Sequence, residues 1–471
     1  MALRIKIRLF FWFLLILTVI LLLDSAVVPG GKISYSSIPG ERNYFIGKLS
    51  PVERMDQERI IGDPVYFSLR TPRKFDHVRI ILEYEKSGDF DLPIIEAGLL
   101  ADNRGHYSLK PVENKILDDL AWDKIAENNL VLYQRNKKFS SIGGFLGDLP
   151  AQDGIALYNH DLDTEYFIDN YEPSQKKTML DRSLRGEYQF FTYVKNEDLD
   201  FKFTVSDLNR NKVSDEIGLN VYYENKPIYS RRLEDDGIAG DSGRVSEDRM
   251  LEINLGDLPE GAYKIEFRAG DDIITRRIET ANSRISFTNK IWLADNGKND
   301  LNLYTDAKSI TAQTTNPGRL QKIKIGDKEI ELKNTFEQVG VMTDYSLKDI
   351  RLEKDDVILA GDGVFAFAKD HFMNPSFRKI NSNTEMDKDG INYVLAEYKA
   401  PEAGKKTNIA TLDFDLKGAY RENGKYGFLI SVPGLRVEDG PDDGLMIKKI
   451  EVDLEGKDIF EFLKKKLNLD E

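Results

Sequence analysis

The sequence predicts a mostly β protein, in which a single N-terminal transmembrane helix precedes tandem antiparallel β-sandwich modules with a few short helices. One continuous apolar run stands near the N-terminus. After it, short runs in which apolar and polar residues alternate recur along the chain, and Gly, Pro, Asn and Asp separate them. With 471 residues, 41% of them hydrophobic, the chain is long enough for two to four packed domains.

The N-terminus combines a basic start with this apolar run. Three basic residues, at positions 4, 6 and 8, precede LFFWFLLILTVILLL at 9–23. The run is short for a membrane core of about 30 Å, but apolar residues at 26–28 extend it. A signal-peptide cut after Ser25 or Ala26 would place a leucine or an aspartate where a small residue is needed. We therefore expect residues 1–8 to be a cytoplasmic tail and 9–28 an uncleaved transmembrane anchor, with a cleaved signal peptide as the alternative.

Composition limits the partners and the compartment. The formal net charge is −14, which disfavours binding to the phosphates of nucleic acid. The chain has no cysteine, so disulfides, thiolate metal sites and cysteine nucleophiles are excluded. Because disulfides are common on eukaryotic cell surfaces, the sequence favours a bacterial cell envelope or surface. We expect the part after the anchor to be extracytoplasmic.

The first region after the anchor begins with a stalk and continues into strands. Gly, Pro and Ser at the start of 29–63 are typical of a stalk. Strands are expected at 64–69, 77–85 and 93–100, within an N-terminal β-rich module at 64–182. One helix is expected at 114–127, where Leu117, Leu120, Ala121, Trp122 and Ile125 are spaced to form an apolar face.

The middle region, 183–283, has the clearest pattern. Seven strand-like runs occupy it, and turns such as NKP at 225–227 and PEG at 259–261 separate them. Seven short alternating strands in about 100 residues predict an immunoglobulin-like sandwich. The segment GDLPEGAYKIEFRAGDD resembles the paired late strands of bacterial Ig-like domains, a resemblance that implies a fold and no particular function.

The last region, 284–471, is also rich in strands. A hairpin is expected at 320–332, where isoleucines flank a Gly-Asp turn. The strands GKYGFLISVPGL and LMIKKIEVDLEG resemble the closing strands of jelly-roll carbohydrate-binding modules. The resemblance implies a jelly-roll-like fold and identifies no ligand-binding residue. An amphipathic helix is expected at the end of the chain, with an apolar face formed by Ile459, Phe460, Leu463 and Leu467.

One loop has the spacing of a calcium site. In DLNRNKVSDE, oxygen-bearing residues occupy positions 1, 3, 5 and 9 of a calcium-type loop: Asp207, Asn209, Asn211 and Asp215. Lys212 and Gly218 stand where such a loop has its glycine and its bidentate glutamate. The alternative is an ordinary loop between strands, because Asp and Asn also favour turns. Weaker versions of the pattern are DKDGIN (Asp387, Asp389, Asn392) and HDLDTE (Asp161, Asp163, Glu165).

No catalytic motif is convincing. GDSG at 240–243 matches the letters around the nucleophile of chymotrypsin-like proteases, but the histidine and oxyanion-hole contexts that Ser242 would need are missing. We expect Ser242 to be a loop residue. Eighty acidic residues would supply a carboxylate pair for glycoside hydrolysis, yet sequence spacing does not give their separation.

These observations predict a membrane-anchored, extracytoplasmic binding or structural protein that contacts a surface glycan or another envelope protein. A glycan-processing enzyme with a carboxylate site and a self-assembling surface subunit remain as alternatives. The sequence assigns no cofactor other than Ca²⁺ at the loop from Asp207 to Asp215, and no nucleic-acid partner.

Overall fold

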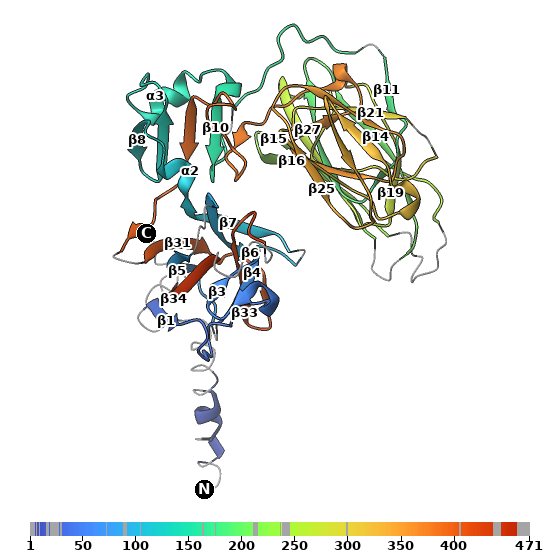
Figure 1. Ribbon diagram of the computed structural model, residues 1–471. Coiled ribbons are helices and arrows are strands. Elements are labelled where there is room, and N and C mark those ends of the chain that lie inside the picture. Colours follow the sequence, from blue (N-terminus) through green and yellow to red (C-terminus); the bar gives the residue numbers. More distant parts are fainter. Residues whose placement is uncertain are drawn as a thin grey trace. The chain divides into compact units, whose positions relative to one another are not determined.

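The computed structural model describes most of the chain after the N-terminal segment (Figure 1). The described residues are 5, 7–8, 10–15, 18, 28, 31–71, 73–87, 92–103, 105–162, 164–174, 176–210, 215–235, 237, 245–297, 300–404, 407–436 and 444–458. The GDSG letters, Asn211, Asp163 and the predicted C-terminal helix lie outside them.

The chain forms two compact units. Unit 1 comprises Met1–Asp161 together with Arg378–Glu471, and unit 2 comprises Leu162–Phe377. This division differs from the three consecutive modules expected from the sequence, because the last strands pair with the first ones. Alternation along a strand identifies the strand but does not identify its partner.

Unit 1 is built on a β-sandwich. One sheet has the order β2-β3-β34-β5-β31-β30, with β1 also paired to β34, and the other has the order β32-β33-β6-β7, with β4 also paired to β33. The strands of the first sheet are β1 (Lys32–Ser37), β2 (Met55–Asp56), β3 (Arg59–Ile60), β5 (His77–Ser87), β30 (Glu402–Ala403), β31 (Asn408–Asp415) and β34 (Gly444–Glu455). The strands of the second are β4 (Val65–Arg70), β6 (Ile94–Leu100), β7 (Tyr107–Asn114), β32 (Arg421–Glu422) and β33 (Lys425–Ser431). Apolar side chains from both sheets form one core.

A smaller sheet completes unit 1. Its order is β28-β10-β29-β9-β8, and β10 runs parallel to both of its neighbours. The strands are β8 (Asp123–Glu127), β9 (Leu130–Gln134), β10 (Ile155–Tyr158), β28 (Arg378–Lys379) and β29 (Tyr393–Ala396). The short helices are α2 (Lys115–Asp118), α3 (Ile142–Gly147) and the 3-10 turns η2 (Val52–Arg54) and η3 (Gln152–Gly154).

The helix predicted at 114–127 is wrong beyond its first turn. Helix α2 ends at Asp118, and 123–127 form strand β8, which pairs with β9 around a turn at Asn128. Asn128 has φ 56°, a conformation that Asn tolerates well in tight hairpins. The apolar residues that suggested one helix therefore belong to two elements: Leu117 is buried in α2, and Ile125 is partly buried in β8.

Unit 2 contains the seven strands predicted at 183–283, and all seven are confirmed. They are β13 (Tyr188–Val194), β14 (Leu199–Asp207), β15 (Ile217–Tyr223), β16 (Lys226–Leu233), β17 (Arg249–Leu255), β18 (Gly261–Arg268) and β19 (Ile273–Thr280). One sheet has the order β11-β19-β14-β17, with β12 also paired to β19. The other begins β16-β15-β18-β13, and inward side chains of both sheets share one core. This arrangement is an antiparallel β-sandwich.

The second sheet does not end where the predicted middle module ends. Strand β13 pairs with β20, β20 pairs with β27, and the sheet continues through β21, β26, β23 and β24, while β22 joins β27 to β25. The hairpin predicted at 320–332 is confirmed as β23 and β24. The remaining elements are β11 (Thr178–Leu180), β12 (Leu184–Arg185), β20 (Ser286–Trp292), β21 (Leu301–Thr305), β22 (Ser309–Gln313), η4 (Pro317–Arg319), β23 (Lys322–Ile325), β24 (Lys328–Glu331), β25 (Val339–Met342), β26 (Lys348–Leu352), β27 (Ile358–Ala366) and η5 (Lys369–His371).

Most of the predicted anchor at 9–28 lies outside the described residues. Residues 10–15 are helical, and their large apolar side chains are exposed. Among the residues that the structure describes, no helix is both long enough and apolar enough to cross a membrane.

Replacing Phe428 by alanine tests the closure of unit 1 by the C-terminal strands. Phe428 is 1% exposed, stacks on Phe67 of β4 at 5.2 Å between ring centroids, and meets Phe414 of β31 edge-on. The change should cost about 3–5 kcal/mol of stability. Hydrogen exchange should show faster exchange at 65–87 and 444–455 together, with β13 and β14 unchanged.

Phe336→Ala is the control, because Phe336 is 70% exposed and its loss should change stability by less than about 0.5 kcal/mol. If Phe428→Ala accelerated exchange only after residue 284, the shared sandwich of the two chain ends would be wrong.

Candidate metal centre

Three aspartates converge at one end of the unit 2 sandwich. Asp207 is the last residue of β14, Asp272 directly precedes β19, and Asp215 lies just before β15. One carboxylate oxygen from each lies within 4.8 Å of the other two. All three side chains are buried, with exposed fractions of 0%, 3% and 6% for Asp207, Asp272 and Asp215.

Strand pairing accounts for this convergence. Strands β14 and β19 are antiparallel neighbours, and Asp207 stands opposite Ile273, so Asp272 follows at the same end of the sheet. Asp215 belongs to the segment that leads into β15, which is in the other sheet. Strand β15 pairs with β18, whose chain continues through Gly270 to Asp272. The cluster therefore lies where strands of both sheets end.

The aspartates also hold the surrounding backbone. The Asn209 N–H donates to Asp207 Oδ1 at 2.7 Å, and the Arg210 N–H donates to Asp272 Oδ2 at 3.1 Å. Ser246 binds the main chain of Asp207. Its N–H donates to the Asp207 carbonyl at 2.7 Å, and its Oγ accepts from the Asp207 N–H at 2.8 Å. The carboxylates of Asp207 and Asp272 are therefore each held by a backbone N–H of the neighbouring loop.

Gly270 leaves room for the carboxylates. A Cβ at this position would lie 2.6 Å from Asp215 Oδ1 and 3.1 Å from Asp272 Oδ1. The first distance is shorter than Cβ contacts in proteins, so any side chain here would displace an aspartate. The close backbone approach is a reason for glycine at this turn.

The other two carboxylates perturb Asp215. Burial, followed by the charges of Asp272 and Asp207, raises the pKa of Asp215 from 3.8 to about 6. Asp235 and a hydrogen bond with Asp272 act in the same direction. Concentrated, buried negative charge of this kind is relieved either by a proton or by a cation.

The oxygen ligands suit a hard cation. Ca²⁺ binds carboxylate and carbonyl oxygens at about 2.3–2.6 Å, so two of its ligand atoms are separated by at most about 5 Å. The cluster satisfies this limit. Histidine and cysteine, which zinc prefers, are not among the clustered residues.

The structure brings together part of the site predicted from the sequence. Asp207 and Asp215 are in the cluster, and Asn209 is buried beside Asp207 with φ 49°. Asn211 lies outside the described residues. Sequence reasoning missed Asp272, 57 positions after Asp215, whose signal was its place directly before a strand that pairs with β14.

The two weaker copies form no such cluster in the described part of the chain. Asp387 pairs with Arg135, and Asp389 Oδ2 accepts the Glu385 N–H at 2.8 Å. Asp161 Oδ1 pairs with Lys379 Nζ at 2.7 Å. These groups have structural partners within unit 1.

No protein-family model and no curated protein matches the chain. Among solved structures, dimeric latent PorU from Porphyromonas gingivalis matches with 10% identity and a TM-score of 0.17, over 64% of this chain and 31% of PorU. The chain thus spans less than a third of that protein. The VP2 subviral particle of infectious bursal disease virus matches with 8% identity and a TM-score of 0.14, over 90% of this chain and 80% of VP2. These similarities are too low to assign a family.

The raised pKa of Asp215 predicts how the metal-free protein responds to pH. A group with a raised folded-state pKa stabilises the fold fully below its unfolded value and loses this contribution as the pH rises through the folded value. In a chelator, unit 2 should therefore lose stability between about pH 4 and about pH 6. Hydrogen exchange of β14 and β19 measures this loss.

Asp215→Asn should remove this pH response, because the amide is isosteric and carries no titrating proton. Asp271→Asn is the matched control, since Asp271 is on the same turn but exposed. An unchanged response in the Asp215 variant would show that the carboxylates do not repel one another as the geometry indicates.

Proposed function

We propose that the chain is an extracytoplasmic binding or structural protein of the cell envelope, in which Ca²⁺ at Asp207, Asp215 and Asp272 organises one end of the unit 2 sandwich. The observation that carries the calcium assignment is the convergence of three buried carboxylates within 4.8 Å. The binding partner is a surface glycan or another envelope protein.

The proposed ion would act as a cross-link between sheets. It would join the end of β14 and the turn before β19, in one sheet, to the segment that enters β15, in the other. Through Ser246, the same cluster reaches the segment before β17. Calcium would thereby order the loops at one end of the sandwich, where proteins commonly carry their binding residues.

The setting outside the cytoplasm fits such a site. Calcium sites of extracellular modules need affinities of only about 10⁻⁴–10⁻³ M. A site built on three carboxylates, with part of its loop departing from the calcium-loop pattern, suits this range. The acidic net charge of −14 also attracts divalent cations.

The N-terminal segment supports attachment to a membrane. Phe10, Phe11, Trp12 and Phe13 are 60–62% exposed in the helical stretch 10–15. Exposing this many neighbouring apolar side chains to water is unfavourable in free energy, and a lipid environment would cover them. The basic residues before them favour a cytoplasmic N-terminus.

Burial weighs against an enzyme at this cluster. A glycan-processing site needs carboxylates that reach a polymer, whereas these three are at most 6% exposed. Self-assembly through the edge strand β16 is also less favoured. The strand is mostly exposed and carries Lys226, Arg231 and Arg232, and such charges oppose edge-to-edge pairing.

Calcium binding can be measured directly on the full chain in detergent micelles. Isothermal titration should give one site per chain, and Ca²⁺ at 100 times its dissociation constant should raise the stability of unit 2 by about 2.7 kcal/mol. Asp272→Asn should weaken binding at least about tenfold, since it removes a charged ligand. Asp271→Asn should bind as the original chain does.

Gly270→Ala should also weaken binding, because its Cβ would displace Asp215. Absence of calcium binding by the original chain at millimolar concentration, with unit 2 folded by hydrogen exchange, would refute the calcium assignment.

Topology is tested by a reporter. A reporter enzyme that is active only outside the cytoplasm, fused after residue 471 and expressed in a bacterium, should be active and should sediment with membranes. Deleting residues 9–28 should abolish both properties. Activity in the soluble fraction of the original fusion would instead favour a cleaved signal peptide.

A further inference from the structure

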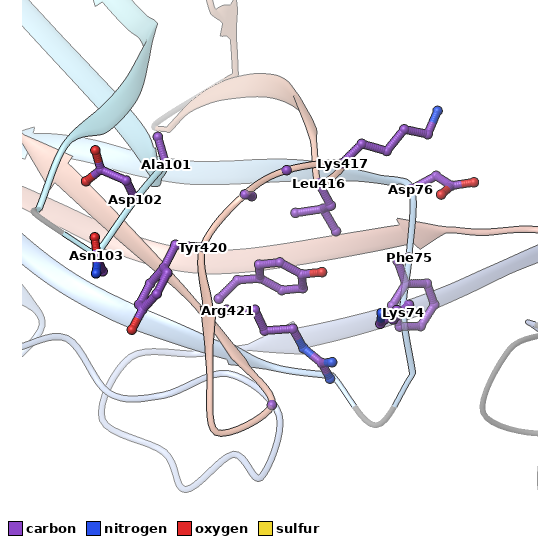
Figure 2. A pocket seen from close by; sticks show the side chains of 14 residues that line it. Lys74, Phe75, Asp76, Ala101, Asp102, Asn103, Leu416, Lys417, Tyr420 and Arg421 are labelled. Carbon is purple, nitrogen blue, oxygen red and sulfur yellow. The ribbon is translucent and has the colours of Figure 1, made fainter. Parts of the chain in front are cut away.

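A pocket of about 830 Å³ lies at one end of the unit 1 sandwich (Figure 2). Three segments line it: the connection between β4 and β5, the turn between β6 and β7, and the loop from β31 to β33. Because β5 and β31 belong to one sheet and β4, β6, β7 and β33 to the other, the pocket lies where strands of both sheets end. Its volume is typical of small-molecule sites.

Backbone hydrogen bonds join the three segments. The Tyr420 N–H donates to the Leu100 carbonyl at 3.2 Å, and the Leu416 N–H donates to the Asp76 carbonyl at 2.8 Å. The Thr71 N–H donates to the Gly424 carbonyl at 3.0 Å. The pocket wall is therefore tied together by the fold itself, and a ligand would not have to order it.

The described lining gathers positive charge in an acidic protein. The lining has three cationic side chains, Lys74, Lys417 and Arg421, against two carboxylates, Asp76 and Asp102. Asp102 Oδ2 is 2.6 Å from His106 Nδ1. The exposed lysines are at the rim. In a chain of net charge −14, this local excess of cations favours a ligand with a single acidic group over a polyanion, which the whole molecule would repel.

Arg421 is held in a defined orientation. Its Nη2 donates to the Thr71 carbonyl, and its guanidinium carbon lies 5.7 Å from the centre of the Tyr426 ring. A guanidinium fixed in this way keeps donors that match a carboxylate. Tyr426 and Phe75 are buried and form an apolar floor.

Tyr420 adds a second kind of contact. It extends from the same loop as Arg421, on the side of Asp102 and Asn103 (Figure 2). Its side chain is half-buried, so part of it is open to solvent. An aromatic face beside amide and hydroxyl groups matches a sugar ring, which has apolar C–H faces and polar edges.

We propose that this pocket binds an acidic saccharide, with the sugar carboxylate at Arg421 and the rim lysines and the ring against Tyr420. The inference rests on the proposed extracytoplasmic binding function and gives it a location and a ligand class. It does not depend on the calcium site, which is in unit 2, so each can be refuted separately.

The test is titration of the full chain in detergent with galacturonic acid, which carries one carboxylate, and with uncharged galactose as the comparison. The acidic sugar should bind at least about tenfold more tightly, and its affinity should fall as salt is raised from 0.05 to 0.5 M, because ions screen the exposed lysines. Calcium titration of the same sample shows whether unit 2 binds Ca²⁺, independently of the result with the sugars.

Two variants assign the site. Arg421→Gln should weaken binding of galacturonic acid about tenfold or more, since it removes the fixed guanidinium. Because Arg421 also supports Thr71, the exposed Lys417→Gln provides a variant without structural consequences, with an expected loss of about threefold. Arg79→Gln is the matched control, because Arg79 pairs with Asp413 outside the lining.

Equal affinity for both sugars, or no binding of either, would overturn the proposal. Binding that neither Arg421→Gln nor Lys417→Gln weakened would also overturn it, by placing the sugar elsewhere on the protein.

Discussion

The pairing of β5 with β34 is the constraint on which the arrangement of the chain depends. The two strands run antiparallel from Ser87 opposite Gly444 to His77 opposite Glu455, with one irregularity between Ile447 and Lys449. Joining two segments this far apart in sequence costs about 5 kcal/mol in loop-closure entropy. The buried side chains of β34, each worth about 1.5–3 kcal/mol, offset this cost. Unit 2 is thereby an insertion between two halves of unit 1.

The junction of this insertion is compact. Strands β10 and β28 pair in parallel, so Leu157 lies opposite Lys379, and Lys379 forms an ion pair with Asp161. The chain therefore leaves unit 1 and returns to it on neighbouring strands. Once unit 2 has folded, the segment between the two halves of unit 1 is no longer a long flexible loop. The entropy cost of pairing β5 with β34 is then smaller.

Local patterns gave correct strands but could not give distant partners. All seven strands at 183–283 follow from alternation, as in Phe201, Phe203 and Val205, whose neighbours are less apolar. The helix at 114–127 failed because a tight turn at Asn128 outweighed helical spacing. Asp207 and Asp215 were found because they share one loop. Asp272 was missed because only the register between β14 and β19 brings it beside them.

The insertion has a consequence for the order of synthesis. Ribosomes add about 5–20 residues per second, so strand β5 exists for tens of seconds before β34 is made. During that time this central strand lacks the partners of both its edges, because its neighbours β31 and β34 are both late in the chain. Unit 2, whose strands pair among themselves, is complete in the meantime. In a nascent chain with this strand order, the strands in the first hundred residues therefore have to be kept from pairing with other chains until β34 has been synthesised.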